Sequence, residues 1–137
     1  MKHTTLAVEI LKDTGDERGR SFPVNIESIV EHFRLRDAHI ATLVPGRVRG
    51  NHYHVGRDEL LLITYTDAWS LHWDSGADTP IQRRRFDGSG AVVVAVPPHC
   101  SHAIRNDGRD VLYLTGLSTH PYDPARPDAI VRNVVAT

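Results

Sequence analysis

Apolar and polar residues alternate with a period of two along much of the chain, which is the spacing of β-strands with one buried face. In the segment 68–74, Trp69, Leu71 and Trp73 share one face, and smaller or polar residues occupy the other. Aliphatic and β-branched runs of strand length predict four more strands, at residues 60–66, 91–96, 111–117 and 129–135. Segments rich in Gly, Asn and Asp separate several of these runs and are typical of turns.

A helical spacing of apolar residues is found only at residues 27–33, where Asn25 or Ser28 is the expected cap. Many short strands with so little helix predict an all-β fold, an antiparallel sandwich or barrel. The segment 118–128 holds three prolines and is expected to wrap the barrel as an irregular arm. Because no linker divides the chain, we expect residues 1–137 to form a single domain.

Length and charge narrow the classes of function. The chain has 137 residues and a formal net charge of −1, so it lacks the basic excess that is typical of nucleic-acid-binding proteins. No apolar run approaches the ~20 residues that span a bilayer. A single cysteine excludes an intrachain disulfide and suits the reducing cytoplasm. We therefore expect a cytoplasmic protein whose partner is a small molecule, not nucleic acid or a membrane.

Histidine is the residue type that indicates chemistry, because nine are present and several are clustered. His52 and His54 are two positions apart, so on a strand both imidazoles project from the same face. If the hairpin that follows pairs His54 with Glu59, these two side chains also share a face. His102, at the start of a later strand, can supply a fourth ligand. Three imidazoles and one carboxylate predict a site for one divalent metal ion, with Zn, Fe, Ni and Mn as the candidates.

Other polar residues are interpreted more simply. A solitary histidine is usually a surface residue or a core residue with satisfied hydrogen bonds, and His72 is assigned to the core or the surface. Cys100 is expected to be a small buried side chain, and the arginine run at 83–85 a solvated strand face. The solitary histidines assigned no role are His3, His32, His39 and His120.

Two segments together resemble the two motifs of the cupin superfamily. In the first motif, Gly46, His52, His54 and Glu59 are in register, and in the second, Pro97, His102 and Asn106 are in register. Thr66 and His99 stand where these motifs have glycine. The resemblance implies an antiparallel jelly-roll β-barrel with its core at about 38–118, an amino-terminal strand arm and a carboxy-terminal tail. It also implies a metal ion inside the barrel mouth, and a homodimer in which an amino-terminal strand augments the partner's sheet.

The phrase Arg49-Gly50-Asn51-His52 is similar to the Arg-Gly-x-His signature of nucleotide-sugar cupins. These include the dTDP-4-dehydrorhamnose 3,5-epimerases and the sugar ketoisomerases. The chain looks most like the carboxy-terminal cupin domain of bacterial capsular-polysaccharide reductases, which act on UDP-linked deoxyhexuloses and carry a metal; residues 16–19 and 122–128 share in this likeness. The resemblance implies isomerisation or epimerisation of a nucleotide-linked keto-deoxysugar, in polysaccharide biosynthesis.

On this resemblance, the reaction is proton transfer at a carbon next to a ketone, so a base, an acid and a diphosphate clamp are needed. We assign the base to His99, which stands near the expected barrel mouth. The candidates for the acid are Tyr53, Tyr65 and Tyr113. Binding of the diphosphate is assigned to the guanidinium groups of Arg47 and Arg49. For Arg47, a plain surface role is the simpler interpretation.

Three alternatives stay open at this point. Rhamnose-type epimerases use the motif histidine as a base without a metal, and His52 cannot both bind a metal and accept the proton. We favour the metal because Glu59 and His102 have no role otherwise. An Fe(II)-dependent dioxygenase uses the same ligand set, and a small cupin can also be a non-catalytic binding or sensor module. Convergent arginines in the pocket would favour a sugar nucleotide, whereas an apolar pocket would favour an aromatic substrate.

Overall fold

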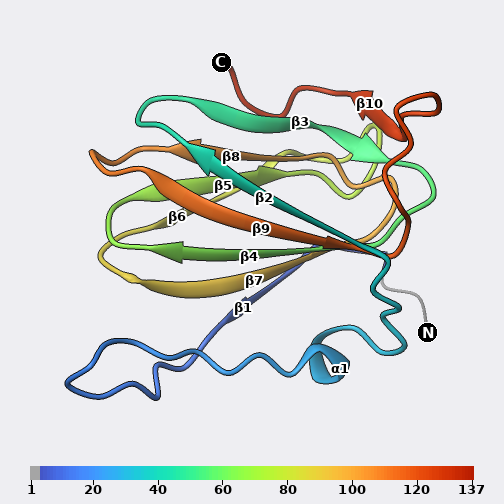
Figure 1. Ribbon diagram of the computed structural model, residues 1–137. Helices are drawn as coiled ribbons and strands as arrows, with labels where there is room; N and C mark the ends of the chain where they lie inside the picture. Colours follow the sequence, from blue (N-terminus) through green and yellow to red (C-terminus); the bar gives the residue numbers. More distant parts are fainter. Residues whose placement is uncertain (1–3) are drawn as a thin grey trace.

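Two antiparallel five-stranded sheets face each other in the computed structural model, which describes residues 4–137 (Figure 1). In spatial order, the first sheet contains β1 (Ala7–Ile10), β7 (Gly90–Val96), β4 (Glu59–Tyr65), β9 (Leu112–Ser118) and β2 (Asp37–Leu43). The second contains β10 (Ala129–Val131), β3 (Val48–His54), β8 (His102–Asn106), β5 (Trp69–Trp73) and β6 (Gln82–Phe86). The only helix among the described residues is α1 (Ile26–Ile29). This arrangement confirms the predicted all-β antiparallel barrel with little helix.

The interior between the sheets is filled by the apolar faces that the alternation predicted. Trp69 and Leu71 of β5 are completely buried and belong to the same core as Val92 and Val94 of β7. The Trp69 ring stacks on Phe86, with ring centroids 4.3 Å apart and 8° between the ring planes. Burial of such large apolar side chains is the main stabilising term of a small barrel, and it holds the strands that carry the polar site.

The segment containing α1 covers the outer face of the first sheet. Asn25 caps the helix as predicted, because its side chain accepts a hydrogen bond from the Ser28 amide, 3.3 Å away. The helix is shorter than the predicted 27–33, since Val30 is already extended, with φ −135°. Because the backbone is extended after one turn, the apolar side chains of this segment can lie along the sheet. Packing against the sheet therefore overrides the helical spacing of these residues. They pack against Leu60, Val93 and Ala95 and come from Ile26, Ile29, Val30 and Phe33.

Residues 119–128 connect the first sheet to the second, from the end of β9 to β10 (Figure 1). β10 pairs with the edge of β3, where Ala129 lies opposite His54. The strand predicted at 129–135 ends at Val131, because the following backbone bonds to a side chain instead: Asn51 accepts hydrogen bonds from the amides of residues 134 and 135.

Among residues 4–137 there is no helix of sufficient length and hydrophobicity to cross a membrane.

Candidate metal centre and substrate pocket

A β-bulge in β3 arranges the polar side chains of the site. Arg49 lies opposite Ile104 of β8 and His52 opposite His102, with one extra residue between, Asn51, in the left-handed region at φ 57°. Arg49 and His52 are three positions apart and would lie on opposite faces of a regular strand. Because the bulge shifts the alternation by one residue, Arg49 lines the same pocket as the histidines.

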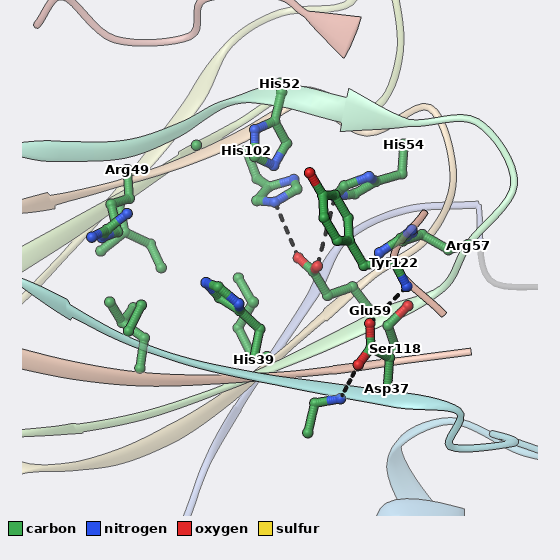
Figure 2. A pocket seen from close by; sticks show the side chains of 17 residues that line it. Asp37, His39, Arg49, His52, His54, Arg57, Glu59, His102, Ser118 and Tyr122 are labelled. Carbon is green, nitrogen blue, oxygen red and sulfur yellow. Dashed lines mark hydrogen bonds and ion pairs between the residues drawn. The ribbon is translucent and has the colours of Figure 1, made fainter. Parts of the chain in front are cut away.

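His52, His54, His102 and Glu59 converge inside the barrel, as Figure 2 shows. One ring nitrogen from each of the three histidines lies within 4.8 Å of the others. The Glu59 carboxylate lies 3.6 Å from His54 Nε2 and 3.4 Å from His102 Nε2. The structure therefore brings together all four residues that the sequence predicted as metal ligands.

Glu59 lies near His54 because of a strand arrangement other than the predicted hairpin. β3 and β4 belong to opposite sheets, so His54 pairs with Ala129, and Glu59 pairs with Val96 and Ser118. The pairing of His54 with Glu59 was therefore wrong. The two side chains meet because both point inward from facing sheets, across the interior of the barrel.

The donor set fits a divalent cation. Both ring nitrogens of His54 are buried and have no hydrogen-bond partner, which is costly unless another group satisfies them. His102 Nδ1 lies 3.2 Å from the Cys100 carbonyl, and donation there leaves the Nε2 lone pair directed to the cluster. A metal-ligating histidine commonly has its second nitrogen bound in this way. Imidazole and carboxylate donors suit Zn, Fe, Ni and Mn.

The protonation states also suit a cation. Burial lowers the pKa of His52 to about 4, and the neighbouring imidazoles of His102 and His54 add to this effect. Burial likewise lowers the pKa of His54. Burial opposes ionisation of Glu59, but the His102 imidazole, 3.4 Å away, and the other adjacent imidazoles outweigh burial and lower the pKa of the carboxyl group. At neutral pH, His52 and His54 are neutral and Glu59 is ionised, the forms that bind metals.

The cluster forms one wall of a cavity of about 490 Å³ between the sheets, a volume that accommodates a small ligand. Arg49 and Arg57 both line this cavity. Arg49 donates from Nε to the Thr42 carbonyl at 2.7 Å, which fixes the direction of its guanidinium group. The Arg57 side chain is only 11% exposed and lies 3.4 Å from Asp128. Two convergent arginines make the pocket suitable for an anionic ligand.

Several pocket residues were missed by sequence reasoning. His39 of β2, interpreted as a residue without a role, lines the pocket, as do Asp37, Arg57 and Tyr122. Figure 2 shows Tyr122 beside the histidine cluster, and the amide of Tyr122 donates to Asp37 at 2.8 Å. The period of two places residues 37, 39 and 41 on one face of β2, but the sequence does not reveal that this face lines a cavity.

Other predicted site residues lie away from the pocket. His99 is exposed in the loop before β8, with its ring 6.1 Å from that of Tyr53. Tyr53 lies beneath the guanidinium group of Arg132, 4.3 Å from the ring centroid, on the face of β3 opposite the histidines. Tyr65 packs in the core against Trp69. None of His99, Tyr53 and Tyr65 is among the residues lining the cavity.

Tyr113 and Arg47 are likewise outside the cavity. Tyr113 is 61% exposed on the outer face of β9, because even and odd positions of that strand face opposite sides. Arg47 is exposed in the turn between β2 and β3, as its simpler interpretation predicted.

The structure also shows where the residues lie for which the sequence predicted no catalytic or binding role. Cys100 is buried, with 1% of its surface exposed. His72 is buried outside the pocket and lies 2.9 Å from the Ser70 hydroxyl. The arginine run at 83–85 is exposed on β6. His32 and His120 are exposed, and His3 lies outside the described residues.

Comparisons with known proteins agree with this architecture. QdtA from Thermoanaerobacterium thermosaccharolyticum, described as a sugar 3,4-ketoisomerase in complex with TDP, is 20% identical with a TM-score of 0.67, over 91% of this chain and 86% of QdtA. NovW, a 4-keto-6-deoxy sugar epimerase from Streptomyces spheroides, is 22% identical with a TM-score of 0.70, over 88% of this chain and 66% of NovW. At these identities, the likeness shows the fold.

The capsular polysaccharide assembling protein CapF from Staphylococcus aureus is 23% identical with a TM-score of 0.65, over 90% of this chain. The match covers 34% of CapF, so the chain corresponds to about a third of that protein. The comparison with curated protein sequences finds no match. The model of the family described as the polysaccharide biosynthesis C-terminal domain matches residues 15–130. These findings confirm the resemblance to nucleotide-sugar cupins, and the chain belongs to the polysaccharide biosynthesis C-terminal domain family.

Proposed function

We propose that this protein is an isomerase or epimerase of a nucleotide-linked keto-deoxysugar, and that it binds one divalent metal ion. The observation that carries the proposal is that the three-histidine, one-carboxylate cluster and two arginines line the same cavity. The activities of QdtA and NovW, a sugar ketoisomerase and a keto-sugar epimerase, support the substrate class. The convergent arginines favour a sugar nucleotide over an aromatic substrate.

The ion would be held by His52, His54, Glu59 and His102. When bound, a divalent ion supplies Lewis-acid stabilisation of negative charge that develops on a ketone oxygen. The orphaned nitrogens of His54 support this assignment, because a buried imidazole without any partner is unfavourable. Arg49 and Arg57 would bind the diphosphate and sugar oxygens, since guanidinium groups match the geometry of phosphate.

Proton transfer is assigned to His39 and Tyr122, which replace His99, Tyr53, Tyr65 and Tyr113 in these roles. Both line the cavity, and neither belongs to the proposed ligand set, so their polar atoms are free for chemistry. An exchange of protons next to a ketone needs a base that removes one proton and an acid that returns another. His39 lies on the first sheet, whereas His52, His54 and His102 lie on the second, so the substrate would be held between them.

One comparison supports Tyr122 and also defines a second mechanism. A double mutant of ChmJ, a 3'-monoepimerase from Streptomyces bikiniensis, has a histidine and a tyrosine replaced. The spacing of these two residues equals that of His52 and Tyr122. In the second mechanism, His52 removes the proton without a metal, and Tyr122 returns it. Both mechanisms give the same overall reaction.

The test combines metal analysis with isotope exchange. Purified protein is analysed for metal per polypeptide, and then incubated in D2O with TDP-4-keto-6-deoxyglucose or a UDP-linked keto-deoxyhexose. We expect deuterium to enter next to the ketone, and chelation to abolish this exchange. Exchange that persists in metal-free protein would support His52 as the base. Absence of exchange with every keto-sugar nucleotide, or substrate-dependent uptake of O2, would contradict the proposed function.

A pair of tyrosine variants tests the assignment of the acid. We expect Tyr122→Phe to lower kcat by 100-fold or more, the usual contribution of a general acid. Tyr113→Phe is the matched control, because its hydroxyl lies on the outer face of β9, 61% exposed. Equal activity of the two variants would contradict a role for Tyr122. His39→Asn and the exposed His32→Asn make the corresponding pair for the base.

A further inference from the structure

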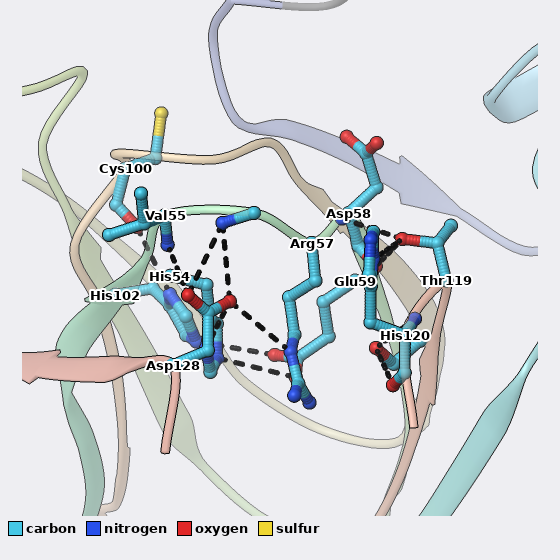
Figure 3. A network of polar contacts seen from close by, with 12 residues as sticks. His54, Val55, Arg57, Asp58, Glu59, Cys100, His102, Thr119, His120 and Asp128 are labelled. Atoms are coloured by element: carbon cyan, nitrogen blue, oxygen red, sulfur yellow. Dashed lines mark hydrogen bonds and ion pairs between the residues drawn. The ribbon is translucent and has the colours of Figure 1, made fainter. Parts of the chain in front are cut away.

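Asp128 lies immediately before β10 and joins the carboxy-terminal part of the chain to the histidine cluster (Figure 3). Its carboxylate accepts hydrogen bonds from the amides of Val55, at 3.1 Å, and Gly56, at 3.3 Å. Oδ2 lies 3.4 Å from Arg57 Nε and 3.9 Å from His54 Nδ1. Asp128 thus combines a backbone contact, which any acceptor could make, with a charge that faces a histidine.

His54 lies between two carboxylates. Glu59 Oε2 is 3.6 Å from Nε2, and Asp128 Oδ2 is 3.9 Å from Nδ1. A neutral imidazole carries one proton, on either nitrogen, and binds a metal through the other. Since Nε2 faces the cluster, metal binding requires the proton on Nδ1. The Glu59 charge attracts the proton to Nε2, and the Asp128 charge attracts it to Nδ1, so Asp128 opposes the form that would block the site.

For His102, the corresponding role is filled by the backbone, because the Cys100 carbonyl lies 3.2 Å from Nδ1. His54 has no such backbone acceptor, since both of its ring nitrogens lack a hydrogen-bond partner. The carboxylate of Asp128 faces Nδ1 from 3.9 Å, beyond hydrogen-bond distance, so it acts on the Nδ1 proton through its charge. A carboxylate behind a metal-ligating histidine usually favours the same orientation and tautomer.

We propose that Asp128 is a positioning residue that holds His54 in the Nδ1-protonated tautomer, so that Nε2 is free to bind the metal. The inference rests on the metal site of the proposed function. It makes the segment that follows β9, and not only the barrel, part of the metal site. The simpler role of Asp128 is to cap the turn at residues 55 and 56 through its backbone contacts.

Asp128→Asn separates these two roles. The asparagine oxygen can still accept from the amides of Val55 and Gly56, but the negative charge is lost and an NH2 group can donate to His54 Nδ1. The proton then moves to Nε2, towards Glu59. We expect the affinity for Zn2+ or Co2+ to fall about 10- to 100-fold, and the melting temperature of the metal-free protein to fall as well, because Arg57 loses its carboxylate partner. Asp128→Glu restores a carboxylate and should recover most of the affinity.

Asp123→Asn is the matched control, because it removes the same charge from the same segment. Asp123 accepts from the Ala125 amide at 2.9 Å and has no contact with the cluster. We expect its metal affinity to equal that of the unmodified protein. A Co2+ affinity and absorption spectrum of Asp128→Asn that match those of the Asp123 variant would overturn the inference, as they would show a capping role alone.

The tautomer itself is measurable without metal. Nitrogen-15 NMR of the metal-free protein distinguishes protonated Nδ1 from protonated Nε2, and Asp128→Asn should increase the Nε2-protonated fraction of His54. An unchanged tautomer ratio would overturn the inference even if metal affinity fell. If the unmodified protein bound no metal but the ratio shifted as expected, the metal part of the proposed function would fail and the positioning by Asp128 would stand.

Discussion

Replacing Gly50 with alanine tests whether the bulge of β3 sets the geometry of the site. Gly50 has φ +105°, and a Cβ atom there would lie 2.5 Å from the His102 carbonyl oxygen and 2.9 Å from the Ala103 Cα. Both neighbours are backbone atoms of β8, so neither can rotate away. Ordinary contact begins at 3.4 Å, and β3 and β8 must therefore separate by nearly 1 Å.

The cost of this change has two parts. A side chain at positive φ is strained by about 1–3 kcal/mol. Separation of the strands weakens one or two ladder hydrogen bonds, each worth about 1 kcal/mol. Gly46→Ala is the control for the first part, because Gly46 has φ +78° but a Cβ added there would meet no atom within 4 Å. We expect Gly50→Ala to lower the free energy of unfolding by about 2 kcal/mol more than Gly46→Ala does.

The assay is urea unfolding of both metal-free variants, followed by Zn2+ titration. Because Gly50 lies opposite Ala103, beside His102, and two positions before His52, both of them proposed ligands, we expect metal affinity to fall at least 10-fold in Gly50→Ala and to be unchanged in Gly46→Ala. Unfolding free energies within about 0.5 kcal/mol of each other, with equal metal affinities, would refute the reasoning that close backbone approach at the bulge shapes the site.

Three further outcomes are expected. Because the pKa of His52 falls from 6.5 to about 4 on folding, the contribution of neutral His52 to the free energy of unfolding is complete above pH 6.5 and declines as the pH falls towards 4. Urea unfolding of the metal-free protein should therefore show a loss of roughly 2 kcal/mol between pH 7.5 and 5. A His52→Gln variant with the same pH dependence would contradict this cause. Arg132→Ala should lower the free energy of unfolding by about 2 kcal/mol, because it leaves Asp74, 4% exposed and 2.8 Å from the guanidinium group, without its charged partner; thermal melts that match the unmodified protein would exclude this. His99→Ala should leave metal content and turnover within about twofold, because His99 does not line the cavity; a large loss of turnover would restore its predicted role as the base.

The proposed metal ligands were predictable because their arrangement depends on short-range geometry. Residues two apart on a strand share a face whatever the strand pairs with, so His52 and His54 were expected together. The way in which Glu59 approaches that pair was not predictable from local spacing. The chain between His54 and Glu59 suggested a hairpin, but the strands enter opposite sheets, and only the inward direction of both side chains brings them together.

The residues proposed for proton transfer show the limit more clearly. Tyr53 is adjacent in sequence to two proposed ligands, yet it faces away from them, whereas Tyr122 is distant in sequence and lines the pocket. His39 was indistinguishable from a surface histidine, because nothing local marks which face of an edge strand lines a cavity. Asp128 joins the site only because β10 pairs with β3, and it meets Arg57, which lies in the connection between β3 and β4.

The sequence by itself determined the all-β class, the alternation that fills the core, the identity of the four proposed ligands and the resemblance to nucleotide-sugar cupins. These depend on the period of the strand and on the spacing of residues along one segment, which are local properties. The tertiary structure decided which sheet each strand joins, where the bulge at Asn51 shifts the alternation, and which distant residues share the cavity. Those outcomes are set by long-range strand pairing and by close contacts between backbones, and neither is encoded in the spacing of any single segment.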